Sequence, residues 1–514
     1  MSGAEGFSRR TVLAAGICLS GLCAARLGAT SIKSPQITAP SGRFIGGFVH
    51  DPVNQVTVRA HRYAGIRYGR AVRFEAPVAV TSSNLMEEQA PYYGPASPQN
   101  GGRYNPTSED CLFLNIWTPA HVFESKGPKK PVMVYFHGGA YATGSVTDPL
   151  NDGAALAARG DVVVVTVNHR LNALGYLYLA RIDPRFPDSG NVGQLDLILA
   201  LQWVQRNITA FGGDRGNVTV FGQSGGGAKI ATLMAMPAAR GLFHKAITMS
   251  GQQVTASGPL NATKRAEAFL EKLGSGIDPA TAPIEQLMAA LSASDPFIGG
   301  QVYMGPVVDM RNLHRHPFWP DAASQSLGLP MLLGNTIAET RAFFSADHAK
   351  IKGLDWGNLA ARMAPEMRVD VHPEWVVDEF RARYPNDSPE QLFHRIITAA
   401  RSWRGQVEEA DTRARGGRGN TFVYQLDFEQ AKHTDDIGLS FGTVSNPTAA
   451  RRAMSETMMD AFIRFAKTSN PGWVAYDAKA RQTMVFDTKS RVVSDPRRWE
   501  RELFARFPYT QPGT

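Results

Sequence analysis

The chain contains very little cysteine, with only three cysteines in 514 residues. Cys18 and Cys23 lie in an apolar N-terminal stretch that we expect to be removed, so only Cys111 would remain in the mature chain. One cysteine cannot form an intramolecular disulfide, which excludes a small disulfide-stapled fold. Stability must therefore come from a hydrophobic core, and the apolar share of 43% is ordinary for a globular protein.

The sequence also lacks internal repeats, heptad arrays and low-complexity tracts, and this excludes solenoid and fibrous architectures. The formal net charge is +8, but the arginines are scattered. The short basic cluster at residues 126–130 contains a glycine and a proline, as solvated loops do. Because nucleic-acid binding needs a local basic surface, we exclude nucleic acid as a partner.

Residues 1–29 have the organisation of an export signal. Arg9 and Arg10 precede an apolar run that ends near Ala25, and small residues follow up to Ala29. Paired arginines are typical of the twin-arginine export route, and the apolar run is shorter than the roughly 20 residues of a membrane span. We therefore predict a signal peptide cleaved after Ala25 or Ala29, export by the twin-arginine machinery, and a periplasmic or secreted protein without a stable membrane span. An uncleaved anchor helix is the alternative.

Strands and helices alternate along the rest of the chain. Apolar, β-branched and aromatic runs at 112–117, 132–136, 162–167 and 218–221 suit strands buried on both faces. Helical patterns lie at 152–159, 195–208 and 454–466, and further strands are expected at 245–250, 329–334 and 422–428. This order predicts an α/β fold with a large, mainly parallel central sheet flanked by helices. We assign residues 30–514 to a single domain with helical cap insertions at about 255–325 and 345–418.

A serine lies at the centre of the glycine-rich turn Gly222-Gln223-Ser224-Gly225-Gly226, between the strand at 218–221 and a helical run at 228–233. In such a turn the serine adopts a strained conformation, and a β-carbon two residues away on either side would clash. The hydroxyl is then exposed, and the N–H of Gly225 points to where an oxyanion would form. These features predict that Ser224 is a catalytic nucleophile.

A nucleophilic serine needs a histidine base, and the base needs an acid that orients it. In chains with this turn, the acid and then the histidine follow the serine, each on a loop after a strand. His433 follows the predicted strand at 422–428 by a short loop. Glu339 is the first carboxylate after the strand at 329–334, and Asp309 is a competing acid because it also ends an apolar run. We favour Glu339 and His433; the other histidines in range are His348, His372 and His394.

The run His137-Gly138-Gly139-Ala140-Tyr141 directly follows the predicted strand at 132–136. Glycines let a backbone approach the substrate closely and turn consecutive N–H groups toward it. This strand precedes the serine strand in the same predicted sheet. The run therefore predicts the second part of an oxyanion-binding site, beside the N–H of Gly225.

Several segments resemble signatures of the type-B carboxylesterase family. They lie at 108–115, 137–141, 168–171, 190–193, 200–205, 211–214, 222–226, and at His433 with 441–442. The resemblance covers about residues 43–487, and within the family the chain is most similar in character to bacterial carboxylesterases. It implies an α/β-hydrolase fold and hydrolysis of a small-molecule ester through an acyl-enzyme intermediate, with no metal or other cofactor. The implied triad is Ser224, Glu339 and His433, and the implied oxyanion hole is Gly139, Ala140 and Gly225.

The chain departs from this family at a few positions near the site. Gln223 and Gly225 replace a glutamate and an alanine beside the serine, and Thr340 replaces a glycine after the acid. Ser97 stands where many relatives have a cysteine that pairs with the residue equivalent to Cys111. These changes resemble bacterial esterases more than animal cholinesterases.

The substrate pocket is less well defined by the sequence. Tyr141, Phe297 and Phe343 are candidate lining residues, although ordinary core positions explain them equally well. Arg341, near the acid, is compatible with an anionic substrate or with a structural ion pair. A lipase or amidase with the same triad is the main alternative function. A non-catalytic binding protein on this fold is less favoured, because all three triad candidates are present. The sequence does not indicate an oligomeric state.

Overall fold

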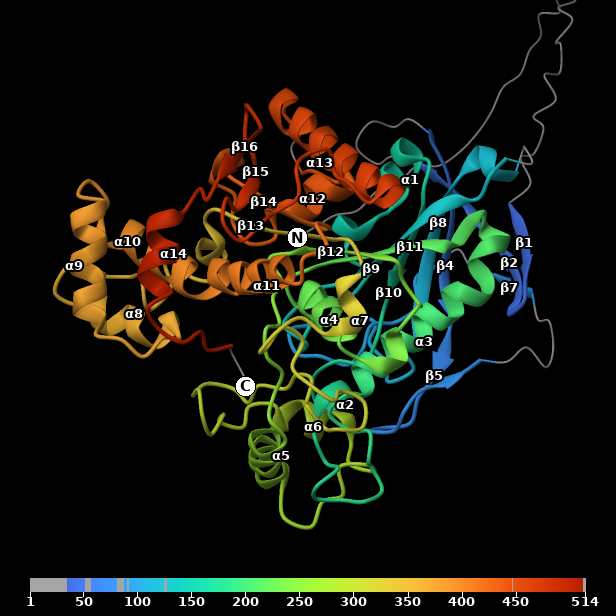
Figure 1. Cartoon of the computed structure of the whole chain (residues 1–514). Coiled ribbons are helices and arrows are strands. Elements are labelled where there is room, and N and C mark those ends of the chain that lie inside the picture. The colour runs from blue at the N-terminus through green and yellow to red at the C-terminus, as the bar shows by residue number, and fades with distance from the viewer. Residues whose placement is uncertain are drawn as a thin grey trace, which may run out of the picture. The chain divides into compact units, whose positions relative to one another are not determined.

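The computed structural model describes residues 35–50, 57–80, 87–89, 92–123, 127–445 and 447–511. The predicted signal peptide at residues 1–29 lies outside them. In the described residues, eleven strands form one sheet in the order β16-β15-β14-β13-β12-β11-β9-β10-β8-β4-β3 (Figure 1). Their bounds are β3 Gly47–His50, β4 Thr57–Arg67, β8 Phe113–Pro119, β9 Lys130–Phe136, β10 Val163–Val167, β11 Gly213–Gln223, β12 Lys245–Met249, β13 Met331–Thr336, β14 Thr421–Leu426, β15 Gln482–Phe486 and β16 Arg491–Ser494. Two small sheets join β1 Gln36–Ala39, β2 Gly42–Ile45 and β7 Glu87–Gln89, and β5 Gly69–Arg70 with β6 Val78–Ala79.

The centre of the large sheet is parallel and its two edges are antiparallel. All neighbouring pairs from β10 through β15 are parallel, whereas β8, β4, β3 and β16 pair antiparallel with their neighbours. Every residue of β10, β12 and β13 is buried, as expected for strands covered on both faces. The predicted α/β fold with a mainly parallel central sheet is confirmed.

Helices cover both faces of this sheet. On β9, Val132 and Val134 pack with α3 in one apolar cluster, whereas Met133 and Tyr135 pack with α1 and α13 in a second. Figure 1 shows α1 and α13 on one face and α3 and α4 on the other. The helices are α1 Ala154–Gly160, α2 Asn172–Tyr176, α3 Val192–Asn207, α4 Gly225–Leu233, α5 Pro259–Leu273, α6 Ile284–Ala290, α7 Ser324–Leu327, α8 Leu359–Met367, α9 Pro373–Arg383, α10 Pro389–Ile397, α11 Arg404–Arg415, α12 Asp435–Phe441, α13 Ala449–Thr468 and α14 Arg498–Phe504.

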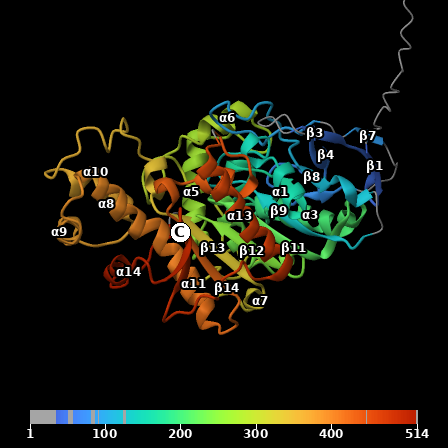
Figure 2. The ribbon, with the colours of Figure 1, turned by 90° about the horizontal axis from the view of Figure 1, so that it is seen from above.

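The two predicted cap insertions differ in how helical they are. Residues 345–418 form α8 to α11, with a π-helical turn at Thr398–Trp403, and α8 to α10 share an apolar cluster with α14 (Figure 2). The insertion at 255–325 is helical in α5 and α6, but between residue 291 and α7 the described chain forms turns and isolated bridges. The helical pattern predicted for the insertion as a whole is therefore interrupted in that stretch. Prolines at 296, 306, 317 and 320 explain the difference, since proline lacks the N–H that a helix interior requires.

The order of the strands places a crevice at the carboxyl ends of β9 and β11. The chain passes from β9 to β10 on one side and later returns to β11 on the other side of β9. Such a reversal separates the connections that leave the two strands, and it is where α/β sheets bind ligands. The loop after β9 and the turn after β11 both open at this point.

Candidate active site

Ser224 occupies a strained turn between β11 and α4. Its backbone angles are φ 55° and ψ −126°, and its N–H donates to the carbonyl of Met249 at 2.8 Å. A β-carbon on Gly226 would lie 1.9 Å from the carbonyl oxygen of Phe136, and one on Gly222 would lie 2.7 Å from the backbone of Gly226. The structure therefore has the close approach that makes both glycines necessary.

Glu339 is fully buried in a short 3-10 turn after β13 and binds His433. Its Oε2 accepts a hydrogen bond from His433 Nδ1 at 2.5 Å, and its Oε1 accepts bonds from Ser250 Oγ at 2.5 Å and the N–H of Thr336 at 2.9 Å. Burial alone would raise the pKa of Glu339, but the charge and hydrogen bond of His433 and the other two donors outweigh it and lower the pKa. Glu339 is thus an ionised acid whose hydrogen bonds fix the orientation of the imidazole.

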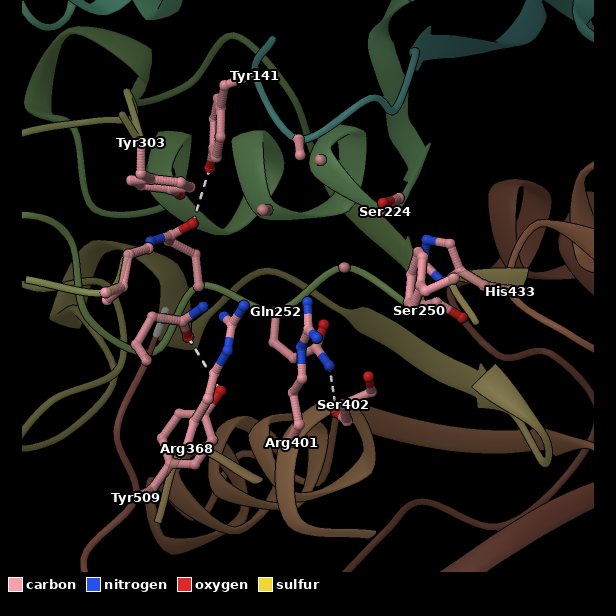
Figure 3. A pocket seen from close by; sticks show the side chains of 18 residues that line it. Tyr141, Ser224, Ser250, Gln252, Tyr303, Arg368, Arg401, Ser402, His433 and Tyr509 are labelled. Carbon is pink, nitrogen blue, oxygen red and sulfur yellow. Dashed lines mark hydrogen bonds between the residues drawn. The ribbon is translucent and has the colours of Figure 1, made fainter. Parts of the chain in front are cut away.

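His433 and Ser224 line the same cavity (Figure 3). Within the described residues they make no hydrogen bond to each other; His433 Nε2 instead lies 3.4 Å from Gln223 Nε2. The ring of Phe343 packs against the imidazole, with 4.7 Å between the ring centroids. Catalytic hydrogen bonds are often long in a ligand-free enzyme and tighten only with substrate bound. The atypical Gln223 is therefore a direct neighbour of the predicted base.

The loop after β9 presents unused backbone donors beside the serine. Gly139, Ala140 and Tyr141 have φ values of 94°, 51° and 64°, and two of these three residues are not glycine. The N–H groups of Gly139, Ala140 and Gly225 donate no hydrogen bond to any described residue. Gly225 lies against the loop, because a β-carbon on it would be 2.8 Å from the nitrogen of Ala140. A strained backbone with free donors is typical of an anion-binding site.

Two contacts from beneath hold this loop in place. The carbonyl of Tyr141 accepts a hydrogen bond from the N–H of Asn172 at 2.7 Å, and the carbonyl of His137 accepts one from the buried Lys229 Nζ at 3.0 Å. Burial lowers the pKa of Lys229 to about 7. Lys229 is on α4, the helix that Ser224 precedes, so one helix supports both the serine and the loop.

The cavity that Ser224 lines has a volume of about 230 Å³. Two of the candidate pocket residues, Tyr141 and Phe343, line it, and the Tyr141 hydroxyl donates to Gln253 Oε1 at 2.8 Å. Phe297 does not line it; this residue is 43% exposed and the guanidinium of Arg265 lies over its ring, while the next residue, Ile298, faces the cavity. The prediction for Phe297 is therefore off by one position. The full lining is Ala140, Tyr141, Ser224, Gly225, Ala228, Ser250, Gly251, Gln252, Gln253, Ile298, Tyr303, Phe343, Arg368, Arg401, Ser402, His433, Tyr509 and Gln511.

The competing candidates lie outside the site. Asp309 accepts hydrogen bonds from Asn191 and from the backbone of its own loop, so it has a structural role. His394 is buried in α10 against Thr340, His372 occupies the N-cap position of α9 without a side-chain capping bond, and His348 binds the backbone of its own turn. Arg341 is exposed and does not line the cavity.

Several polar residues that line the cavity are not among those predicted from the sequence, and they include Ser250, Arg368 and Arg401. Ser250 directly follows β12. Its position near Ser224 could be predicted from the sequence, because neighbouring parallel strands end at the same edge of the sheet and β11 ends at the serine turn. The two arginines lie in the predicted cap insertion, where no motif or spacing identifies them. Their position depends on how the cap helices fold.

Two negative observations apply to the described residues. No helix among them is both long enough and apolar enough to cross a bilayer. Nor do they contain a group of three or more histidine, cysteine, aspartate or glutamate side chains arranged to hold a metal ion. Cys111 is a free, buried thiol, and burial raises its pKa to about 12.

Known proteins resemble this chain over most of its length. A model of the Carboxylesterase family matches residues 33–501. The para-nitrobenzyl esterase of Bacillus subtilis (strain 168) is 33% identical over 487 residues, covering 86% of this chain and 94% of that protein. Among solved structures, a carboxylesterase of Geobacillus stearothermophilus has a TM-score of 0.79 at 32% identity, covering 91% of this chain and 99% of that one. An esterase from Clostridium hathewayi, described as able to hydrolyse aliphatic aromatic polyesters, has a TM-score of 0.71 at 31% identity, covering 92% and 98%.

The sequence comparisons and the structure comparisons identify the same family. The family match spans nearly the whole described chain, and the solved structures share its fold. The resemblance inferred from short motifs is thereby confirmed, as is the fold that it implied. The chain belongs to the carboxylesterase family: it is a carboxylesterase, a serine ester hydrolase of the α/β-hydrolase fold.

Proposed function

We propose that Ser224, Glu339 and His433 form the catalytic triad and that small-molecule carboxylic esters are hydrolysed through an acyl-enzyme on Ser224. The observation that carries the proposal is the 2.5 Å hydrogen bond between the buried Glu339 and His433 Nδ1, with the imidazole and Ser224 lining one cavity. Such a bond fixes the imidazole tautomer, leaving Nε2 to act as the base. It also stabilises the imidazolium that forms when the serine proton is taken.

The reaction then follows from the positions of these groups. His433 Nε2 takes the proton of Ser224 as Oγ attacks the ester carbonyl, and the N–H groups of Gly139, Ala140 and Gly225 bind the oxyanion. His433 next gives the proton to the departing alcohol, which leaves an acyl group on Ser224. Water, deprotonated by His433, attacks this ester, and the acid is released. A single missing oxyanion donor would cost on the order of 3 kcal/mol in the transition state.

The decisive experiment replaces the serine. Ser224→Ala should lower kcat for 4-nitrophenyl butyrate by at least about 10⁴-fold while the melting temperature stays unchanged. Mass spectrometry after a brief reaction should find the acyl mass on a Ser224 peptide of the unmodified enzyme. The control is Ser292→Ala, an exposed serine on the cap, which should retain full activity. Unchanged hydrolysis by Ser224→Ala would exclude this serine as the nucleophile.

We also propose that residues 1–29 direct export by the twin-arginine route and that the mature enzyme acts in the periplasm or outside the cell. The paired Arg9 and Arg10 before a short apolar run support this proposal. Expression of the full chain and N-terminal sequencing of the exported protein test it. A mature start just after Ala25 or Ala29 is expected, and an intact N-terminus would contradict it.

A further inference from the structure

The cavity wall that the cap contributes carries an arginine pair, Arg368 and Arg401. Arg368 follows α8, Arg401 lies in the π-helical turn before α11, and both side chains line the cavity. Figure 3 shows both guanidinium groups directed into the cavity from the wall opposite Tyr141 and Ser224. No aspartate or glutamate is among the described residues that line the cavity. The arginine pair therefore makes the charge that faces the cavity positive, with no carboxylate in the lining to balance it.

The carboxylates nearby do not neutralise this arginine pair. Glu366 is the acid that pairs with Arg401, at 3.4 Å, and it also binds Lys350. The single carboxylate of Glu366 is thus shared by Arg401 and Lys350. Arg368 adds a third positive charge to this region without adding a carboxylate. Nη1 of Arg368 is buried and has no hydrogen-bond partner among the described residues. Buried polar groups are normally paired, so this guanidinium has hydrogen-bonding capacity that no described residue uses, while the Arg368 side chain also lines the cavity.

The backbone holds the arginine pair in place through unusual local structure. Arg368 has a φ of 57°, in the left-handed region that a residue with a side chain rarely adopts. Arg401 lies in a π-helical turn, a form that is rare and concentrated at functional sites. Its guanidinium also lies 5.6 Å from the ring centroid of Phe343, which in turn packs on His433. Arg401 is thereby connected to His433 through one aromatic side chain.

We infer that the substrate of this enzyme is an ester that also carries a carboxylate, which Arg368 and Arg401 bind while Ser224 attacks the ester carbonyl. This inference rests on the proposed function and specifies its substrate class. Planar guanidinium groups bind carboxylates through paired hydrogen bonds, and partial burial strengthens them. Burial and the charge of Arg401 lower the pKa of Arg368 to about 10, so the side chain is still a cation at neutral pH. A bound carboxylate would supply the negative charge that faces the arginine pair.

The test compares matched esters. The monoethyl esters of succinic, glutaric and adipic acid carry a terminal carboxylate, and the corresponding amide esters are the same length but neutral. We expect kcat/KM for the best half-ester to exceed that of its amide by about 10- to 100-fold, the range for a partly buried charged hydrogen bond. Raising the salt concentration should reduce this preference, because ions screen the attraction.

Substitutions assign the preference to the arginine pair. Arg368→Gln and Arg401→Gln should each lower the half-ester to amide ratio of kcat/KM by about tenfold or more, mainly through KM. Arg383→Gln removes the same charge from an exposed position on α9 of the cap and should keep the ratio. Melting temperatures identify variants that fail to fold, and Arg368→Lys, which keeps the charge, should retain part of the preference in any case.

A binding measurement separates this inference from the proposed function. Calorimetry of glutarate with Ser224→Ala reports on the arginine pair without catalysis. Binding that is lost when Arg368→Gln is added would support the inference even if Ser224 were not the nucleophile. The opposite outcome is also possible to recognise. If hydrolysis of neutral esters depends on Ser224 but the enzyme neither prefers half-esters nor binds glutarate, the inference is overturned and the proposed function is left intact.

Discussion

The two walls of the cavity are built in different ways. The Ser224 wall consists of backbone at the carboxyl ends of β9 and β11, where glycines allow contacts as close as the one between Gly226 and Phe136. The cap wall consists of side chains, chiefly Arg368, Arg401 and Tyr509, from helix ends and from the C-terminal segment. In the proposed mechanism the first wall offers N–H donors to the reacting carbonyl, and the second offers charge and rings to the rest of the substrate.

We expect this difference to separate catalysis from selectivity. The backbone donors on the Ser224 wall do not depend on which side chains surround them, so the wall suits any ester. The cap wall changes with every side chain that faces the cavity. Substitutions on the first wall should therefore alter the rate for all esters together, whereas those on the second should alter the ratio between esters.

The largest effect is expected from Gly226→Ala on the Ser224 wall. Its new β-carbon would lie 1.9 Å from the Phe136 carbonyl oxygen and 3.0 Å from that of His137, and backbone atoms cannot rotate away as a side chain can. We expect a loss of more than about 4 kcal/mol in the free energy of unfolding, or no folded protein. Gly258→Ala, at the start of α5 in the cap, meets nothing within 4 Å and should be stable. Thermal unfolding of the two variants checks this, and equal melting temperatures would contradict it.

A second prediction concerns the helix behind the cap wall. Glu409 on α11 is fully buried and accepts the N–H of Gln253 at 2.7 Å, and burial raises its pKa to about 8. Between the usual pKa of about 4.5 and 8, the folded protein keeps this proton and the unfolded chain has lost it, so stability falls as pH rises through this window. Glu409→Gln removes the ionisation and keeps the acceptor. Its stability relative to the unmodified enzyme should increase from pH 5 to pH 8 by on the order of 3 kcal/mol.

Urea unfolding at both pH values measures this difference. Glu408→Gln is the control, because its carboxylate is partly exposed beside Arg404 and the substitution should give the same stability difference at both pH values. A difference for Glu409→Gln that does not change with pH would contradict the prediction. The result bears on the cap wall, because Gln253 lines the cavity and binds Tyr141 across it.

The two walls also differ in how far the sequence predicts them. The Ser224 turn and the loop after β9 were predicted from local patterns, because a strand end, a glycine and a short spacing define each of them. The strand at 218–221 was predicted too short: β11 begins at Gly213, where polar residues give no apolar signal and the pairing with β9 shifts register. Arg368 and Arg401 could not be predicted, because only the packing of α8, α10 and α14 brings them together.

Gly225→Ala tests whether the loop after β9 can move away from residue 225 without loss of activity. Alanine is usual at this position in the family, yet here its β-carbon would lie 2.8 Å from the nitrogen of Ala140. The loop must move, which displaces an oxyanion donor, and we expect kcat to fall about tenfold for neutral and carboxylate esters alike. Gly328→Ala, which meets nothing within 4 Å, is the control. Full activity of Gly225→Ala would show that the loop adjusts without loss of the donor.

Gln223→Glu should have the smallest effect and sharpens the contrast between the walls. It restores the glutamate usual in the family, 3.4 Å from His433 Nε2 in the present side-chain position. A carboxylate there favours the protonated imidazole, which cannot accept the serine proton, so the acid limb of the profile of kcat/KM against pH should move up by about 1 pH unit. Gln391→Glu, exposed on α10, adds the same charge far from the imidazole and should leave the profile in place. Because Gln223 touches the base and not the cap, the half-ester preference should stay constant at pH values above the limb. A changed preference there would mean that the two walls are not independent.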